Sequence, residues 1–352
     1  MQQIILYQLS GSIILKKNQS IEISHDIKPT EKSTQQGRIY YGLLGIIKLV
    51  NTYAFLIKEQ SKIGQIRNCS IYKVITIEAI NCTKMELSGQ QIEQETYCLE
   101  GIQQALSNLY YSIEYDLTMP LAYNTRHIST LTPGKSSDIV CNDFWFNHHI
   151  SLSLMEYPEF RLKAICGFVE LKSISLSHQS NSSISSLLGL ISRKYNKRGG
   201  TRYHSRGIDS NGDVSNCVET EQFCLIDKDW QSHLQVRGSI PLFWKHTITG
   251  AYAPLMQIHD PSSVETKEAY LKHYQWLHNK YGSLTFVNLV DQKGKELLLS
   301  QGFAKQLLYT PDVNYIAFDF HKECSKLRWH RLSLLLDQLK KNLDNYSYFE
   351  LM

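Results

Sequence analysis

Hydrophobic and polar positions along the chain predict a mixture of strands and helices. The apolar stretch 43–57 (LLGIIKLVNTYAFLI) is rich in β-branched and aromatic residues and predicts two strands around a turn at Asn51–Thr52. Residues 71–80 predict another strand, and further strand candidates surround 162–171. A helix is predicted where apolar residues recur at spacings of three and four, at Leu99, Ile102, Leu106, Leu109 and Ile113.

The Ser-rich segment 175–186 interrupts this pattern. It reads equally well as a hinge between two halves or as a long surface loop within one domain. We expect two domains, residues 1–175 and 176–352, which agrees with a length of 352 residues.

The second half alternates between strand and helix patterns. A strand is expected at 187–195, and Ser262 with Glu265 resembles a capping box that opens a helix ending near Gly282. Then follow a strand (284–290), a helix (295–308), a strand (313–320) and a helix (325–343). Such a series typically builds a partly parallel sheet. The predicted class is therefore α+β, with a mostly antiparallel first lobe and an incomplete mixed-sheet second lobe.

Composition excludes several classes of function. The net charge is only +4, so no global field favours nucleic acid. The eight cysteines form no C-x-x-C pair, which disfavours a zinc ribbon or a thioredoxin-type motif and indicates reduced thiols. The N-terminus lacks the features of a signal peptide, and no apolar run is long enough to span a bilayer.

The stretch GGTRYHSRGIDSNGDVSNCVETEQ (199–222) combines two turn dipeptides, Gly199–Gly200 and Asn211–Gly212. It predicts a strand at 201–206 between two turns. The segment 193–206 contains six cations and no acid, namely Arg193, Lys194, Lys197, Arg198, Arg202 and Arg206; four acids follow, at Asp209, Asp213, Glu219 and Glu221. The cations could hold a phosphate. Alternatively, they pair with the acids that follow.

This stretch closely resembles the signature of the Sac phosphoinositide phosphatase domain. Other ordered matches are YGLLGIIKLVNTYAFLI (41–57), YDLT (115–118), RGSIPLFW (237–244), FVNLVDQKGKE (286–296) and FDFHKECSKLRWHRLSLLLDQL (318–339). The resemblance covers about residue 38 to 352 and is nearest to the endoplasmic reticulum and Golgi members.

The resemblance implies hydrolysis of a phosphate monoester from the inositol ring of a membrane lipid, such as phosphatidylinositol 4-phosphate. The family's chemistry uses a C-x5-R-T/S loop, in which a cysteine thiolate attacks phosphorus and an arginine clamps the phosphoryl group. No cysteine of this sequence has an arginine six residues later. We therefore expect no catalytic residue in this chain and a truncated, inactive form. The alternative is a non-catalytic module that binds phosphoinositides or a protein partner.

The resemblance also implies the residues of the site. Arg202 and Arg206 are the candidates on the substrate side. The expected framework consists of Asp209, Glu219, Glu221, Arg237, Asp319, His321 and Glu323. We expect no metal and no cofactor, a lipid headgroup at a membrane surface as the partner, and no nucleic acid. The resemblance implies an endoplasmic reticulum or Golgi membrane, on its cytosolic face.

Alternation of Asp319 and His321 with phenylalanines places both polar groups on one face of the predicted strand. A Cys324–His321 pairing could be imagined, but we favour a polar network that supports a neighbouring loop. Trp244 and Trp329 are expected to be packing residues rather than membrane contacts.

Overall fold

The fold is described from a computed structural model of the chain. The structure describes residues 4–9, 12–16, 38–83, 85–128, 142–177, 183–200, 205–226, 229–247, 255–346 and 349–351. Two compact units are present: the first takes in Met1–Asn196 and Thr220–Ser232, and the second takes in Lys197–Glu219 and His233–Leu351. The expected boundary at 175/176 falls inside a strand, β9 (Gly167–Ser177), and the division into functional lobes stays a prediction.

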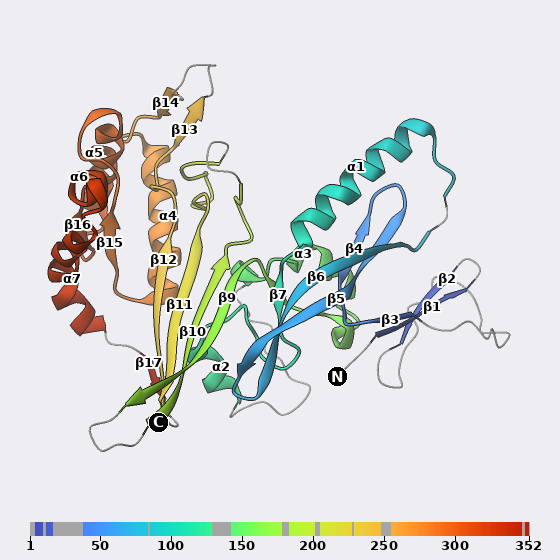
Figure 1. Cartoon of the computed structure of the whole chain (residues 1–352). Coiled ribbons are helices and arrows are strands. Elements are labelled where there is room, and N and C mark those ends of the chain that lie inside the picture. The colour runs from blue at the N-terminus through green and yellow to red at the C-terminus, as the bar shows by residue number, and fades with distance from the viewer. Residues whose placement is uncertain are drawn as a thin grey trace. The chain divides into compact units, whose positions relative to one another are not determined.

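The first unit is built mainly on antiparallel strands (Figure 1). Its five-stranded sheet has the order β4-β5-β6-β7-β8, and a second sheet joins β2, β1 and β3. The strands are β1 (Ile4–Leu9), β2 (Ser12–Lys16), β3 (Arg38–Tyr40), β4 (Gly42–Lys48), β5 (Thr52–Ile66), β6 (Cys69–Asn81), β7 (Tyr110–Tyr111) and β8 (Ala164–Ile165). The helices are α1 (Gly89–Leu106), α2 (Leu121–Ile128) and α3 (His148–Ser151).

The predicted strands of residues 43–57 and 71–80 are confirmed as β4, β5 and β6. The predicted helix is displaced: α1 begins at Gly89, where Ser88 forms a capping box with Gln91, and ends at Leu106. Leu109 lies next to β7, and Asn108 has a φ of 62°. The periodic pattern failed because apolar residues of a helix and a following strand share one core.

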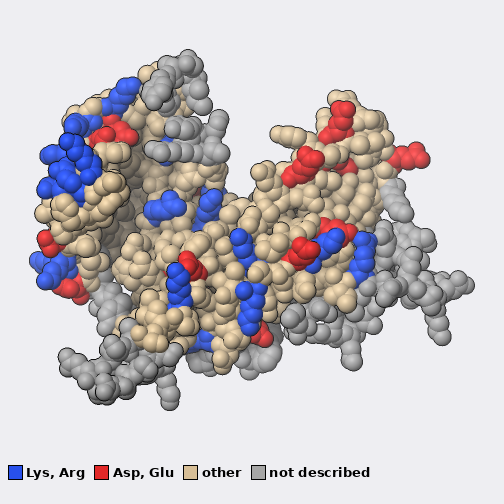
Figure 2. Space-filling model, in the orientation of Figure 1, with Lys and Arg blue, Asp and Glu red and all other residues tan. Residues whose placement is uncertain are grey.

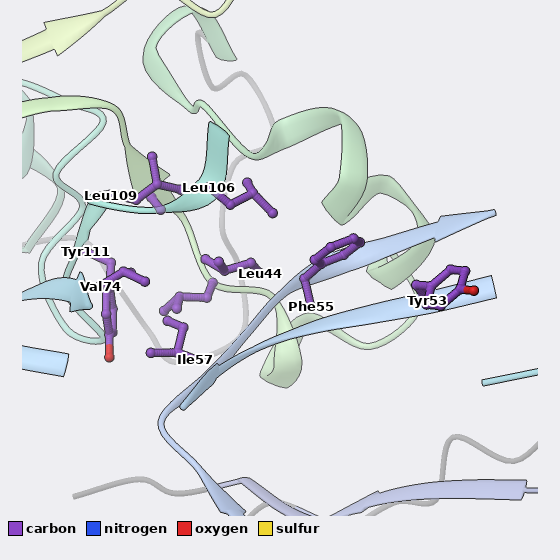
Figure 3. Packing of buried hydrophobic residues seen from close by; sticks show 10 residues of the cluster. Leu44, Tyr53, Phe55, Ile57, Val74, Leu106, Leu109 and Tyr111 are labelled. Atoms are coloured by element: carbon purple, nitrogen blue, oxygen red, sulfur yellow. The ribbon is translucent and has the colours of Figure 1, made fainter. Parts of the chain in front are cut away.

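That core lies between α1 and the sheet. Figure 3 shows Leu44, Phe55 and Ile57 of the sheet facing Leu106 and Leu109. The turn between β4 and β5 is fixed by a buried carboxylate of α1. Glu95 accepts hydrogen bonds from the Asn51 backbone N–H (2.6 Å) and from the Tyr53 hydroxyl (2.6 Å). A buried charge is tolerated where such donors satisfy it.

A five-stranded sheet of order β17-β12-β11-β10-β9 includes the strands β10 (Ser183–Lys194), β11 (Val218–Ile226), β12 (Asp229–Arg237) and β17 (Phe349–Leu351). β9 and β10 pair in antiparallel register from Gly167↔Arg193 to Ser177↔Ser183. The Ser-rich segment is therefore largely the paired ends of two strands, and the loop prediction was wrong for Ser175–Ser177 and Ser183–Ser186. Residues 178–182 lie outside the described part of the chain.

The second unit contains β13 (Trp244–Thr247), β14 (Leu255–Ile258), α4 (Val264–Tyr281), β15 (Thr285–Asn288), α5 (Leu297–Gln306), β16 (Asn314–Ala317), α6 (Phe320–Cys324) and α7 (Leu332–Tyr346). Short 3-10 turns lie at Gly294–Glu296, Leu307–Tyr309, Ser325–Leu327 and Trp329–Arg331. The predicted alternation of strands and helices is confirmed, with shorter elements. The N-cap of α4 is Ser263 instead of Ser262, and Gly282 ends this helix with a φ of 78°.

β15 and β16 pair in parallel, connected through α5. Phe303 of α5 packs against Phe286 of β15 and Tyr315 of β16, with ring centroids 5.6 Å apart in both pairs. The parallel pair and the antiparallel sheets confirm the expected α+β class. The carboxyl ends of β15 and β16 lie at the same edge, where α/β proteins commonly place ligand sites.

Candidate functional site

Residues 197–200 and 205–217 form a loop, in which an isolated antiparallel bridge joins Ile208 and Val214 across the predicted turn at Asn211–Gly212. Most of the strand predicted at 201–206 lies outside the described residues. Asp209 closes the turn. Its Oδ1 accepts hydrogen bonds from the backbone N–H groups of Asn211 (3.0 Å) and Asp213 (2.9 Å). An aspartate that satisfies nearby N–H groups in this way closes a tight turn. Asp209 is therefore part of the framework of the loop.

This turn is attached to α4. The His273 Nδ1 donates to the Gly212 carbonyl at 3.1 Å, and the Lys272 Nζ donates to the Ser210 carbonyl at 2.8 Å. Gly212 has a φ of 87°, and a Cβ there would lie 2.8 Å from the backbone nitrogen of His273. Glycine permits this close approach. Burial lowers the pKa of His273 to about 4, so the imidazole is neutral near pH 7.

Two cations of the segment hold the loop itself. The Arg198 Nη2 donates to the Ser215 hydroxyl (2.8 Å) and to the Arg206 carbonyl (2.9 Å). Its Nη1 lies 3.7 Å from Asp209 Oδ2. The Lys197 Nζ lies 3.3 Å from Asp213 Oδ2. For these residues the structure bears out the pairing of cations with the acids that follow.

A third cation, Arg193, is fully buried in the first unit and binds Glu221. Arg193 Nη2 lies 2.6 Å from Glu221 Oε2, and both side chains have zero exposure. Arg193 also donates to the carbonyls of Leu117 (2.6 Å) and Met119 (3.1 Å), while Leu121 N–H donates to Glu221 (2.8 Å). These two residues tie β10 and β11 to the segment that enters α2.

Arg206 occupies the edge of the loop, and its guanidinium lies over the Trp244 ring, 5.4 Å from the centroid. The Trp244 Nε1 donates to the Ile240 carbonyl at 3.2 Å, which orients the indole. The N–H of the next residue, Gly207, donates to the Ser239 hydroxyl oxygen at 2.9 Å. The segment 237–244 therefore supports the loop around Arg206. Arg202 lies outside the described residues.

A second group of expected residues follows the parallel strands. Asp319 is the N-cap of α6: Oδ1 accepts from Lys322 N–H at 2.9 Å and Oδ2 accepts from Gln292 N–H at 3.2 Å. Burial acts to raise the pKa of Asp319, but these two donors and the charges of Lys293 and Lys322 outweigh it, so the pKa lies below its ordinary value. Asp319 thus joins the segments that follow β15 and β16.

His321 contacts the segment that follows β15. Its Nδ1 lies 2.6 Å from Asp291 Oδ1, and the hydrogen bond and charge of Asp291 raise the pKa of His321. Residues 320–324 form α6, so the prediction of alternating strand positions was wrong. Asp319 and His321 nevertheless reach neighbouring residues because the helix begins at the strand end. Cys324 is buried while His321 is 77% exposed, which does not support a Cys–His pairing.

The remaining expected residues, Glu323, Glu219 and Arg237, lie in three different environments. Glu323 binds Arg331, whose Nε lies 2.7 Å from Oε2. Glu219 is buried and accepts a hydrogen bond from the Tyr281 hydroxyl at 2.6 Å. Arg237 is exposed at the end of β12. In their described contacts these side chains brace the fold or face solvent, and a role in binding stays a prediction.

Sequence reasoning missed Asp291 and Gln292 as partners of Asp319 and His321. Both belong to FVNLVDQKGKE, directly after a predicted strand, and two parallel strands bring their carboxyl ends together. Their position directly after a predicted strand was therefore the sequence signal that could have identified them. The role of Trp244 beneath Arg206 had no local signal, because 38 positions separate the two residues.

The first unit contains an open pocket of about 440 Å³, lined by Tyr41–Leu43, Ser112–Asp116 and Pro158–Lys163. Its charges are mixed: the Lys163 Nζ lies 2.6 Å from Asp116 Oδ2. The guanidinium of Arg161 lies 5.4 Å from the centroid of the Trp145 ring. None of the expected site residues lines this pocket.

The described residues lack two other features, a metal-binding cluster and a bilayer-spanning helix. No cluster of three or more His, Cys, Asp or Glu side chains there has the arrangement needed to hold a metal ion. None of the helices in this part of the chain combines the length and hydropathy that a bilayer crossing requires.

Comparison with known proteins identifies the family. Residues 41–325 match the SacI homology domain. The chain is 32% identical to the phosphatidylinositol-3-phosphatase SAC1-B of Danio rerio over 94% of this chain and 56% of the relative, and 32% identical to the phosphatidylinositol-3-phosphatase SAC1 of Saccharomyces cerevisiae over 87% and 50%. The phosphoinositide phosphatase SAC8 of Arabidopsis thaliana is 29% identical, over 92% and 56%.

The chain spans about half the length of the curated relatives it matches. The matched region includes both the loop around Arg206 and the strand ends at Asp291 and Asp319. The chain belongs to the Sac-domain phosphoinositide phosphatase family.

Proposed function

We propose that this chain recognises the phosphorylated inositol headgroup of a phosphatidylinositol monophosphate. The relatives are named for phosphoinositide substrates, which supports this class of ligand. Arg202 and Arg206 are the proposed phosphate contacts. The residues Asp209, Glu219, Glu221, Arg237, Asp319, His321 and Glu323 are the proposed framework of the site.

The observation that carries the proposal is the position of Arg206 over Trp244. Stacking on an indole fixes the plane of a guanidinium, and a fixed guanidinium loses less entropy when it forms two parallel hydrogen bonds to a phosphate. Arg198, Lys197 and Asp209 hold the loop that presents this arginine. The loop is thereby pre-organised before a ligand arrives.

As the activity of the family we propose hydrolysis of this headgroup at its phosphate ester, with phosphatidylinositol 3- and 4-phosphate as the candidate substrates. For this chain by itself we propose binding without turnover, because no cysteine in the sequence is followed by an arginine six residues later. A binding module is thus the second candidate function, and it is supported by this same sequence feature.

Calorimetric titration with the soluble headgroups of the 3-phosphate and 4-phosphate lipids tests recognition, with inorganic phosphate as the reference ligand. We expect tighter binding of at least one headgroup than of inorganic phosphate. Equal or absent binding would refute recognition. Release of phosphate from the same lipids in vesicles tests turnover, and clear release by this chain would refute binding without turnover.

A further inference from the structure

The turn between α6 and α7 exposes apolar side chains. All six residues from Ser325 to His330 are exposed. Leu327 and Trp329 are 77% and 54% exposed, although the sequence led us to expect Trp329 as a packing residue. The indole lies beside the Phe320 ring, with centroids 6.1 Å apart. Exposed large apolar groups side by side mark interaction surfaces.

The backbone of this turn is strained. Lys326 and Leu327 have φ values of 54° and 60°, and both lie in the left-handed region that non-glycine residues seldom adopt. Each such residue lowers the stability of the folded chain. Strain of this kind persists where the surroundings fix it, and it is found at functional sites.

Arg328 fixes the turn. Its Nη2 donates to the Lys322 carbonyl (2.8 Å) and to the Ser325 hydroxyl (2.8 Å), and its Nε donates to the Ser325 carbonyl (3.0 Å). These bonds close the end of α6 with a cation, which suits the unsatisfied carbonyls of a helix terminus. Leu327 and Trp329 are therefore held outward on either side of an anchored arginine.

The surroundings of the turn are cationic. The segment 321–331 contains six basic residues: His321, Lys322, Lys326, Arg328, His330 and Arg331. Its one acid, Glu323, binds Arg331. Figure 2 shows lysine and arginine side chains gathered where Figure 1 draws α6 and α7. A surface of this charge is complementary to a negatively charged partner.

We propose that the turn 325–330 is a contact with the surface of a bilayer that contains anionic lipid. Trp329 and Leu327 would enter the interfacial region, where tryptophan is favoured. Lys322 and Lys326 would face the lipid headgroups and attract anionic lipid. This membrane contact rests on the proposed function, because a bilayer presents the phosphoinositide headgroup.

Co-sedimentation of the full chain with vesicles tests this contact. We expect binding to phosphatidylcholine vesicles that contain phosphatidylserine, and much weaker binding to phosphatidylcholine alone. The double substitution Leu327→Ser and Trp329→Ser should weaken binding about tenfold, since burial of part of two apolar side chains is worth on the order of 1.4 kcal/mol. Lys326→Glu should weaken binding and reduce its dependence on salt.

Leu298→Ser with Leu308→Ser is the matched control, because these leucines of the same unit are 62% and 80% exposed. The control should bind as the unchanged chain does, and all variants should share one melting temperature. Unaltered binding by the Leu327/Trp329 variant, or equal loss in the control, would overturn the membrane contact. So would a change in oligomeric state without a change in vesicle binding, which would identify a protein interface.

These vesicles contain no phosphoinositide, so they test the membrane contact separately from headgroup recognition. Failure here, with headgroup titration intact, refutes the contact and leaves the proposed function standing. Vesicle binding without headgroup binding refutes headgroup recognition. The membrane contact then loses the functional reason on which it was proposed.

Discussion

Arg193 and Glu221 form an ion pair with no solvent exposure, with Arg193 Nη2 2.6 Å from Glu221 Oε2. The carbonyls of Leu117 and Met119 and the N–H of Leu121 complete the hydrogen bonding of the pair. The glutamate of the family signature is therefore satisfied within the first unit by a cation that precedes the signature. Such a pair is costly to break, because one partner alone leaves a buried charge.

We expect Glu221→Gln to lower the free energy of unfolding by about 3–5 kcal/mol. Glu170→Gln is the control, because Glu170 pairs with Lys172 on the surface at 2.9 Å and should lose less than about 1 kcal/mol. Urea titration followed by circular dichroism measures both. Similar losses in the two variants would show that the buried pair does not hold the unit together.

His273 should make the stability of the second unit depend on pH. The unfolded imidazole takes up a proton below about pH 6.5, whereas burial delays this to about pH 4 in the folded chain. The free energy of unfolding should therefore fall as the pH decreases from 6.5 to 4, by on the order of 3 kcal/mol. His273→Gln keeps a donor for the Gly212 carbonyl and should remove most of this decline. An unchanged pH profile in the variant would contradict the assignment.

The pKa of His321 should depend on Asp291. In the folded chain the carboxylate raises this pKa, so the pair stabilises the fold below the ordinary histidine pKa and this contribution is lost as the pH rises through the raised value. We expect Asp291→Asn to shift the His321 titration to lower pH in NMR spectra. A titration of His321 that the substitution leaves in place would exclude the ion pair.

Two glycines with positive φ should differ in their tolerance of a side chain. A Cβ at Gly207 (φ 70°) would lie 2.5 Å from the Leu242 carbonyl oxygen, whereas at Gly282 (φ 78°) no atom lies within 4 Å. Gly282→Ala should cost about 1–2 kcal/mol from backbone strain alone. Gly207→Ala should lower the free energy of unfolding by more than this. It should also weaken headgroup binding, because Gly207 directly follows Arg206. Thermal melting compares the two, and equal losses would show that the loop yields to the added methyl group.

The sequence predicted the fold best where composition or capping residues mark an element. β-branched and aromatic residues indicated β5 and β6, a capping motif and a terminal glycine indicated α4, and the family motifs located the loop around Arg206. Prediction failed where polar side chains replace regular pairing. Asp319 starts a helix where a strand was expected to continue, whereas the predicted turn at Asn211–Gly212 is present and is closed by Asp209.

The partners of the candidate site were harder to predict than its members. Trp244 beneath Arg206 is a contact made by the folded chain with no local signal of pairing, and Asp291 beside His321 was indicated only by its position after a predicted strand. Charge counting also misled. Arg193 belongs to the run of cations that favoured a phosphate site, yet it is buried with Glu221. Only tertiary structure separates a structural cation from one available to a ligand.

Titration of this chain with the soluble headgroup of phosphatidylinositol 4-phosphate tests the central claim most directly when it compares variants. Arg206→Ala and Arg202→Ala should each weaken binding roughly tenfold or more, since a charge-assisted hydrogen bond to phosphate is worth about 1.5–3 kcal/mol. Arg206→Lys should recover part of the loss. The control Lys58→Ala with Lys62→Ala removes two exposed cations of β5 and should bind as the unchanged chain does. Equal affinity in the arginine variants, with the fold intact, would contradict the assignment of this loop as a phosphoinositide site.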